Sequence, residues 1–274
     1  MLTHPLLPKL RELRLSGMVD TLEERAQMAQ LQSLTPVDFL ALLLDDEIDR
    51  RQQRKRGRLE RSAGFEAPAT LAQFDFAAVP CLDRSLVLDM ATCQFVLKKH
   101  NWLLCGSTGV GKSHLATSIG YEAIKRGMTV LFMNSSTMLK ELLAARADGS
   151  HGKLMATIGR CDLLIIDDFG LRPLTETGAD DLYEIIHSRY ERGSIIITSN
   201  RSPSEWLELF GNTLIASAAL DRLTHHARIT IITGESYRQK DRRTGLKQTV
   251  TNSNVTVEVG PKAPSQGGDQ NGPA

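Results

Sequence analysis

The chain has 274 residues, of which 41% are hydrophobic and 24% are charged. This length and composition favour one main globular domain of ordinary size with a smaller appendage. The formal net charge is only +1, which excludes a global electrostatic field that would by itself indicate a nucleic-acid partner.

The four cysteines are scattered and form no C-x-x-C pair, so neither a disulfide framework nor a zinc site is predicted. They are Cys81, Cys93, Cys105 and Cys161. Two of them lie next to predicted core strands, where a free cysteine behaves as a small apolar residue. The N-terminus lacks the apolar block of a signal peptide, and no apolar stretch of about 18 residues could cross a membrane. We therefore expect a reduced, cytoplasmic location without membrane contact.

Residues 1–61 are predicted to form a small all-helical N-terminal domain. A first amphipathic helix is expected over about residues 6–18, closed or bent by Gly17. A second helix is expected over about residues 21–31. A third begins at Thr35, because the proline that follows is favoured at the first helical position.

A strongly basic run closes this domain. Its twelve positions, 50–61, hold a single acid, Glu60, and seven basic residues: Arg50, Arg51, Arg54, Lys55, Arg56, Arg58 and Arg61. Such a run can follow nucleic-acid phosphates by displacing their counterions. A solvated helix face that leads into a linker is an equally good interpretation.

Residues 62–80 contain glycine and proline and lack a long periodicity, so they are predicted to be a linker. Three phenylalanines in this segment, Phe65, Phe74 and Phe76, are expected to pack on the next domain.

Residues 81–245 alternate between strand and helix patterns, which predicts an α/β domain with a parallel sheet. Continuous apolar runs, typical of a sheet covered on both faces, predict strands at 101–105, 129–134, 162–168, 194–199 and 228–233. Helices are expected at about 113–126, 136–147, 176–192 and 204–223. Residues 246–274 are polar and are expected to be a disordered tail.

A phosphate-loop motif, G-x-x-x-x-G-K-[ST], lies between the first predicted strand and the first predicted helix of this domain. Its residues are Gly106, Ser107, Thr108, Gly109, Val110, Gly111, Lys112 and Ser113. The glycines let successive N–H groups point at one phosphate chain near the positive end of the helix. Lys112 would reach the β- and γ-phosphates and the Ser113 hydroxyl would hold Mg²⁺. His114 completes the predicted nucleotide-binding segment, although its side chain could simply pack.

Two carboxylates, Asp167 and Asp168, end the predicted strand 162–168. Ligands of open α/β sheets bind at the carboxyl ends of the strands, which places these acids beside the phosphate loop. Asp167 suits the carboxylate that orients Mg²⁺ through bound water. Asp168 suits the group that polarises the water attacking the γ-phosphate. A strand that ends in solvated acids is the alternative.

Two further residues are candidates because of their positions. In a five-stranded sheet of order 5-1-4-3-2, Asn200 would follow the strand between the phosphate loop and the acids, where it could contact the γ-phosphate or the attacking water. A turn-forming asparagine is the alternative. Arg222 could project into the nucleotide of a neighbouring subunit and stabilise transition-state charge. It could equally be a surface arginine paired with Asp221.

His225 and His226 are adjacent. Adjacent side chains diverge on a helix, and no other ligand is expected near them, so we predict no metal site there.

Four segments carry a family resemblance: Gly-Ser-Thr-Gly-Val-Gly-Lys-Ser-His-Leu-Ala, Leu-Leu-Ile-Ile-Asp-Asp-Phe-Gly, Ile-Ile-Ile-Thr-Ser-Asn-Arg and Leu-Asp-Arg-Leu. Together they resemble IstB, the helper ATPases of a bacterial insertion-sequence family. These are relatives of the DnaC helicase loaders within the AAA+ ATPases. The resemblance covers about residues 1–240.

The resemblance implies an ATP-dependent homo-oligomer that wraps and bends double-stranded DNA and delivers it to a partner transposase, which it stimulates. It makes Lys112 and Ser113 nucleotide ligands, Asp167 the Mg²⁺-site acid, Asn200 the sensor and Arg222 a trans-acting arginine finger. For DNA contacts it points to the helix after the second strand and the following loop. The basic residues available there are Lys140, Arg146 and Lys153.

Two features depart from the wider AAA+ pattern. The second acid is usually glutamate, and the shorter side chain of Asp168 predicts slow hydrolysis. No helical lid is predicted after the strand 228–233, where only a short basic segment remains.

Three other functions stay open: a DnaC-like loader of a replicative helicase, a small-molecule phosphotransferase, and a nucleotide-dependent scaffold. A phosphotransferase would normally carry an arginine-rich lid, and no such insertion is evident in the sequence.

Overall fold

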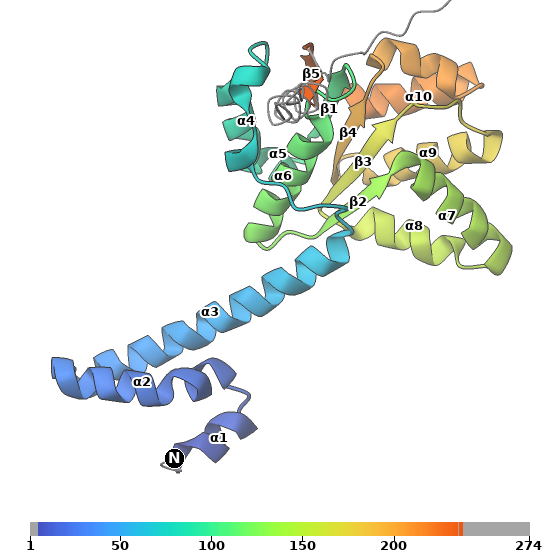
Figure 1. Cartoon of the computed structure of the whole chain (residues 1–274). Coiled ribbons are helices and arrows are strands. Elements are labelled where there is room, and N and C mark those ends of the chain that lie inside the picture. The colour runs from blue at the N-terminus through green and yellow to red at the C-terminus, as the bar shows by residue number, and fades with distance from the viewer. Residues whose placement is uncertain (1–4, 235, 238–274) are drawn as a thin grey trace, which may run out of the picture. The chain divides into compact units, whose positions relative to one another are not determined.

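The computed structural model describes residues 5–234, 236 and 237 (Figure 1). The predicted tail and the basic segment after Tyr237 lie outside the described residues. Within the described part of the chain, no helix is long and apolar enough to span a membrane.

Three helices form the N-terminal part: α1 (Leu6–Glu12), α2 (Ser16–Gln32) and α3 (Pro36–Ala63). The predicted start of α3 is confirmed, because the Thr35 hydroxyl accepts a hydrogen bond from the Asp38 N–H at 3.2 Å. Met18, Leu22 and Leu43 form the small buried core between α2 and α3.

The predicted role of Gly17 is wrong, because this residue neither closes nor bends the first helix. It lies in the first turn of α2, and the chain turns earlier, where Arg14 has a φ of +57°. A Cβ atom at position 17 would lie 2.6 Å from the Cα of Glu47. Glycine is therefore required for the close approach of α2 to α3.

Charged side chains also join α2 to α3, and one of them, Glu47, is buried. The Glu47 carboxylate accepts hydrogen bonds from the Gly17 N–H at 2.6 Å and from Arg51 Nε at 2.7 Å. Arg25 donates to Asp46 through Nε and Nη2, at 2.8 and 2.7 Å. This hydrogen bond from Arg25 lowers the pKa of Asp46 to about 2.

The basic run lies on α3, which continues unbroken through it. Two of its arginines pair within the helix, Arg51 with Glu47 and Arg56 with Glu60. At the end of α3, Leu59 and Ala63 join the core of the α/β part. A domain boundary at residue 61 stays a prediction.

The five predicted strands are confirmed as one parallel sheet. They are β1 (Asn101–Gly106), β2 (Val130–Asn134), β3 (Leu163–Phe169), β4 (Ser194–Ser199) and β5 (Ala227–Ile232). Their order, β2-β3-β4-β1-β5, is the predicted one. In this register Leu104 lies opposite Thr198, so the end of β1 is adjacent to the end of β4.

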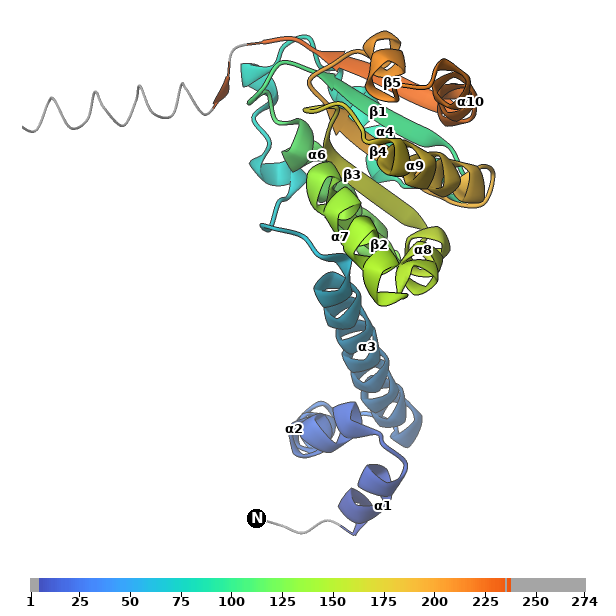
Figure 2. The ribbon, with the colours of Figure 1, turned by 90° about the vertical axis from the view of Figure 1, so that its right-hand side faces the viewer.

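Helices cover both faces of the sheet (Figure 2). They are α4 (Arg84–Ala91), α5 (Gln94–Leu97), α6 (Lys112–Lys125), α7 (Ser135–Asp148), α8 (His151–Arg160), α9 (Glu176–Arg189) and α10 (Thr213–Thr224). Alternate residues of a strand point to opposite faces of the sheet and therefore pack in different hydrophobic cores. Trp102 and Leu104 pack with α4 to α6, and Leu103 and Cys105 with α7 to α10.

Several predicted elements needed correction. The sequence interpretation missed α4, α5 and α8, which are short; α8 begins just after Gly149, whose φ of +76° ends α7. The helix expected at 204–223 is a 3₁₀ segment, Pro203–Leu209, followed by α10, with Gly211 (φ +67°) between them. Two further 3₁₀ turns, Leu71–Gln73 and Phe76–Ala78, lie in the linker.

The linker packs on the α/β part, as predicted. Phe65 stacks on Tyr121 of α6 with the ring centroids 4.5 Å apart. Phe74 and Phe76 are partly buried against the same core.

Candidate nucleotide-binding site

The phosphate loop joins β1 to α6 and has a backbone that requires glycine. Gly106, Gly109 and Gly111 have φ values of +139°, +84° and +94°. A Cβ atom at Gly106 would lie 1.9 Å from the Ile232 carbonyl oxygen, and one at Gly111 would lie 2.6 Å from the Phe74 ring. The tight loop expected from the motif is therefore present, enclosed by β5 and the linker.

Lys112, the first residue of α6, is 5% exposed. Its Nζ donates to the carbonyl oxygens of Gly106 and Ser107, at 2.8 and 2.7 Å, and to Oδ1 of Asn200 at 2.7 Å. The structure thus brings Lys112 and Asn200 together, as the sheet order requires. A phosphate oxygen could replace these neutral acceptors, since charge-assisted hydrogen bonds are the stronger ones.

The two acids lie at the end of β3, and one hydroxyl of β4 contacts both residues. Thr198 Oγ1 donates to Oδ1 of the buried Asp167 at 2.5 Å and accepts from the Asp168 N–H at 3.0 Å. The Asp168 carbonyl accepts from Ser135 Oγ at 2.9 Å. Thr198 and Ser135 therefore fix the acid pair from the two neighbouring elements.

Asp168 has a left-handed backbone with a φ of +55°. It lies in an irregularity of β3 between Ile166 and Phe169, where the pairing with β4 shifts. A bulge of this kind re-aims a side chain that a regular strand would place by simple alternation. The left-handed conformation costs about 1–3 kcal/mol and persists only where the surroundings hold it.

Sequence reasoning missed Thr198 and Ser135. A signal for Thr198 was available, because it directly follows a run of isoleucines in a strand buried on both faces. A polar side chain in such a position needs a hydrogen-bond partner. Ser135 carried no comparable signal, since serine at a helix start is common.

The remaining motif residues differ in exposure. Ser107 and Thr108 are exposed, whereas Val110 is buried in the core and offers only its backbone to a ligand. His114 Nε2 lies 3.0 Å from the Thr70 carbonyl oxygen. The histidine ring therefore contacts the linker.

Two residues of this site could hold a divalent cation. Ser113 is half-buried in the first turn of α6, and Asp167 is a buried carboxylate at the end of β3. Hydroxyl and carboxylate oxygens are the ligand types that Mg²⁺ prefers.

The chain beyond β5 returns to the phosphate loop. The Tyr237 N–H donates to the Gly109 carbonyl at 3.0 Å. A Cβ atom at Gly109 would lie 2.2 Å from Ser236 Oγ. No sequence motif predicts this contact.

Arg222 lies near the end of α10, at the side of the sheet where the parallel strands begin. The phosphate loop lies at the opposite side, where the strands end. The next residue, Leu223, accepts a hydrogen bond from Asn101 Nδ2 at the start of β1. The phosphate loop begins at the other end of this strand, roughly 16 Å away at about 3.3 Å per residue. Arg222 is therefore remote from the phosphate loop of its own chain.

The Arg222 guanidinium has partners of its own. Its Nη1 donates to the Ala218 carbonyl at 2.8 Å, and its Cζ lies 5.6 Å from the centre of the Tyr183 ring. The salt bridges among the described residues do not include a pair with Asp221.

The three candidate DNA-contact residues have different surroundings. Lys140 on α7 and Lys153 on α8 are exposed. Arg146 pairs with Asp181 of α9, which is 2% exposed, and His151 Nε2 lies 2.8 Å from the same carboxylate. Arg146 therefore also joins α7 to α9.

All four cysteines are free, as predicted. Burial raises the pKa of Cys93 and of Cys105 to about 11. These two thiols stay protonated near neutral pH and act as apolar core residues.

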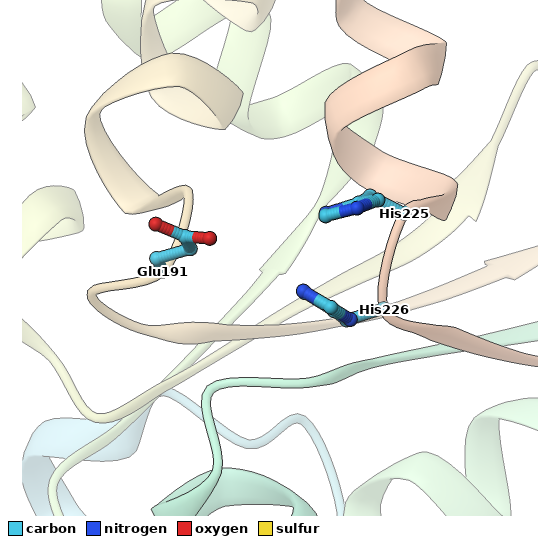
Figure 3. Close-up of side chains that lie close together, drawn as sticks. All are labelled: Glu191, His225 and His226. Carbon is cyan, nitrogen blue, oxygen red and sulfur yellow. The ribbon is translucent and has the colours of Figure 1, made fainter.

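The expectation that His225 and His226 diverge is wrong. Helix α10 ends at Thr224, so the two histidines leave the helix and their ring centroids lie 3.9 Å apart. Glu191 lies beside them (Figure 3).

The sequence profile of the IstB-like ATP binding protein family matches residues 8–245. The chain belongs to this family. It is an ATPase of the P-loop class.

Curated relatives of this IstB-like protein match it over most of both chains. A candidate insertion sequence ATP-binding protein of Sinorhizobium fredii is 37% identical and is aligned over 89% of this chain and 99% of its own length. A candidate ATP-binding protein in an insertion sequence of Mycobacterium tuberculosis is 39% identical, over 85% and 93%. The candidate ATP-binding protein of insertion sequence IS21 from Pseudomonas aeruginosa is 36% identical, over 87% and 89%.

Solved structures share the fold of this IstB-like protein. DnaI matches with a TM-score of 0.53 at 23% identity and covers 62% of this chain and 96% of its own. A replication initiator, DnaA, bound to AMPPCP and single-stranded DNA, matches with a TM-score of 0.51 at 22% identity. That match covers 67% of this chain and 56% of DnaA.

Proposed function

We propose that this IstB-like chain is an ATP-dependent, DNA-binding oligomer that assembles on target duplex DNA, remodels it, and recruits and stimulates a partner transposase. The observation that carries the nucleotide part is the meeting of three elements at one edge of the sheet. Lys112 on the phosphate loop contacts Asn200 after β4, and Thr198 of β4 contacts Asp167 at the end of β3.

On this proposal, the residues at the carboxyl ends of the strands have separate roles in the transfer of the γ-phosphoryl group to water. The loop N–H groups and Lys112 bind the phosphates of ATP, and Ser113 and Asp167 hold Mg²⁺, which neutralises phosphate charge when bound. Asp168 accepts a proton from the attacking water or orients it. Asn200, already within hydrogen-bond distance of Lys112, senses the γ-phosphate.

Arg222 acts on the nucleotide of a neighbouring subunit. The support is its distance from the phosphate loop of its own chain, with the whole length of β1 between them. An arginine supplied in trans stabilises the charge that develops on the transferred phosphoryl group. On this proposal a complete site requires two chains, which ties hydrolysis to assembly.

The DNA and transposase parts rest on the insertion-sequence relatives and on the distribution of charge. Lys140 and Lys153 are exposed on α7 and α8, and the basic run is carried by α3. We expect these lysine and arginine side chains to contact the phosphates of DNA and not its bases. DNA binding should therefore depend strongly on salt and little on base sequence. Preference among targets would come from the deformability of the DNA.

A loader of a replicative helicase is the second candidate, because the sequence motifs also resemble those of the DnaC helicase loaders. A reconstituted assay distinguishes the transposition helper from the helicase loader. ATP hydrolysis stimulated by duplex DNA, together with faster strand transfer by the transposase of the same insertion sequence, supports the proposal. ATP-dependent capture of a replicative helicase, with no effect on strand transfer, supports the loader.

Electron microscopy of the protein with ATP and duplex DNA tests assembly directly. The proposal predicts oligomers that surround bent DNA. Lys140→Glu and Lys153→Glu together should weaken DNA binding without loss of ATP binding, and Lys98→Glu, which changes an exposed lysine at the end of α5, is the matched control. DNA binding unchanged in the double variant would contradict this placement of the DNA surface.

A further inference from the structure

Three side chains with metal-binding chemistry meet at the sheet edge opposite the phosphate loop. Glu191 comes from the turn between α9 and β4, and His225 and His226 come from the turn between α10 and β5. One ligand atom from each residue lies within 4.8 Å of the others, and all three side chains are exposed. Figure 3 shows the carboxylate and both rings facing a common space.

One residue, Asn101 at the start of β1, bonds both to the turn that carries the histidines and to the start of β4, which follows the turn that carries Glu191. Its N–H donates to the His226 carbonyl at 3.1 Å, and its Nδ2 donates to the Leu223 carbonyl at 2.9 Å. Its Oδ1 accepts from the Ile195 N–H at 2.9 Å. Asn101 therefore links the turn that carries the histidines to the first residues of the strand that follows Glu191.

The turn that carries Glu191 is also closed internally. The N–H groups of Arg192 and Gly193 both donate to the Arg189 carbonyl at 2.9 Å, and Glu191 has a φ of +58°. The Arg189 guanidinium below the turn is buried and donates to the Ser194 carbonyl at 2.7 Å. The backbone that carries the Glu191 side chain is thus held by a closed turn.

The imidazole rings have neighbours that orient them. The Tyr190 hydroxyl lies 2.8 Å from Nδ1 of His225, which leaves Nε2 of that ring available for a metal. The ring of His226 stacks on His100, with centroids 5.2 Å apart and an interplanar angle of 15°. A hydrogen bond to the second ring nitrogen is the usual partner of a metal-bound histidine.

We propose that Glu191, His225 and His226 bind a divalent transition-metal ion, with Zn²⁺ as the best match. Two imidazoles and one carboxylate form a three-ligand set that leaves a fourth tetrahedral position for water or another ligand. Bonds of about 2.0–2.1 Å require ligand atoms about 3.3 Å apart. Exposed side chains on fixed turns can close that remaining gap by rotation alone.

This site is distinct from the Mg²⁺ site proposed at the nucleotide. Imidazole ligands favour Zn²⁺, Cu²⁺ and Ni²⁺, whereas Mg²⁺ prefers oxygen ligands and releases its water reluctantly. Millimolar Mg²⁺ should therefore leave the ion at the histidines in place. Glu191 and His226 also border a small cavity shared with Arg222, so the bound ion would lie beside the surface that carries that arginine.

The test is a titration of Zn²⁺ into the untagged full-length protein against a chromophoric chelator, with millimolar Mg²⁺ present. The expected result is one ion per chain. Tyr190→Phe should weaken binding by about tenfold, and His225→Ala, His226→Ala and Glu191→Gln should each weaken it by about a hundredfold or more. Because the three ligands are exposed, these variants should keep the melting temperature of the metal-free protein.

Two matched controls identify the ligands. His187→Ala removes an exposed histidine of α9 that stacks on Tyr183 outside the cluster, and Cys81→Ser removes an exposed free thiol. Both should bind Zn²⁺ like the parent chain. Binding only at millimolar Zn²⁺, unchanged binding in a His225→Ala/His226→Ala variant, or loss of binding in Cys81→Ser would each overturn the proposal.

Discussion

Thr198 is the residue on which the geometry of the acid pair depends. Its single hydroxyl donates to the buried Asp167 carboxylate and accepts from the Asp168 N–H. It therefore positions both the group proposed to hold Mg²⁺ and the group proposed to act on water.

Replacing Thr198 by valine keeps the shape of the side chain but removes both hydrogen bonds. Burying an unsatisfied donor or acceptor costs about 1–3 kcal/mol, so we expect a comparable loss of unfolding free energy in urea. The turnover number for ATP hydrolysis should fall more than the affinity for ATP. Thr198→Ser, which restores the hydroxyl, should recover most of both, and equal turnover in Thr198→Val would contradict this role.

At the scale of single elements, the α2–α3 pair depends on the ion pair between Arg25 and Asp46. The hydrogen bond from Arg25 lowers the pKa of Asp46 from 3.8 to about 2. A carboxyl whose pKa is lowered by folding stabilises the protein above its unfolded-state pKa, and this stabilisation is lost as the pH falls through the folded-state value.

The variant Asp46→Ala should therefore have a lower melting temperature than the parent chain at pH 7. The difference should persist down to about pH 4 and shrink as the pH falls toward 2. Asp49→Ala, which changes an exposed acid on the same helix, is the matched control and should keep the melting temperature of the parent chain at pH 7. A pH-independent difference for Asp46→Ala would show that the ion pair is not its cause.

Long elements with a repeating pattern were predictable from the sequence, and local exceptions to the pattern were not. The five apolar runs predicted the strands of the sheet, and the glycine spacing predicted the phosphate loop. With the strand order 5-1-4-3-2, Asn200 was expected near the phosphates, and the structure places it against Lys112. The left-handed backbone of Asp168 could not be predicted, since it depends on Thr198 and Ser135 from other elements. The approach of Gly17 to Glu47 and the meeting of Glu191 with the two histidines likewise depend on tertiary packing.

At the scale of the whole molecule, the positions of Arg222 and the phosphate loop have a consequence for assembly. They lie at opposite ends of β1, so one chain cannot supply both to the same nucleotide. If Arg222 acts in trans, hydrolysis per chain must rise with protein concentration until assembly saturates.

The variant Arg222→Ala should bind ATP normally and hydrolyse it about a thousandfold more slowly, the lower end of the range for a lost arginine finger. Mixing it with Asp168→Ala should restore part of the activity, because some interfaces then combine an intact loop and acid pair with an intact arginine. The measurement is phosphate release as a function of mixing ratio. No recovery at any ratio would indicate that Arg222 does not act across subunits.

The central claim is that the phosphate loop and the acid-bearing end of β3 together bind ATP. Isothermal titration of the protein with ATP and Mg²⁺ tests it most directly, with Lys112→Ala as the variant. Lys125→Ala, at the far end of the same helix where Lys125 pairs with Glu122, is the matched control. We predict one ATP bound per chain in the parent protein and in Lys125→Ala, and no ATP bound in Lys112→Ala. Equal affinity for ATP in all three proteins, or no heat of binding from the parent chain at millimolar ATP, would contradict the claim.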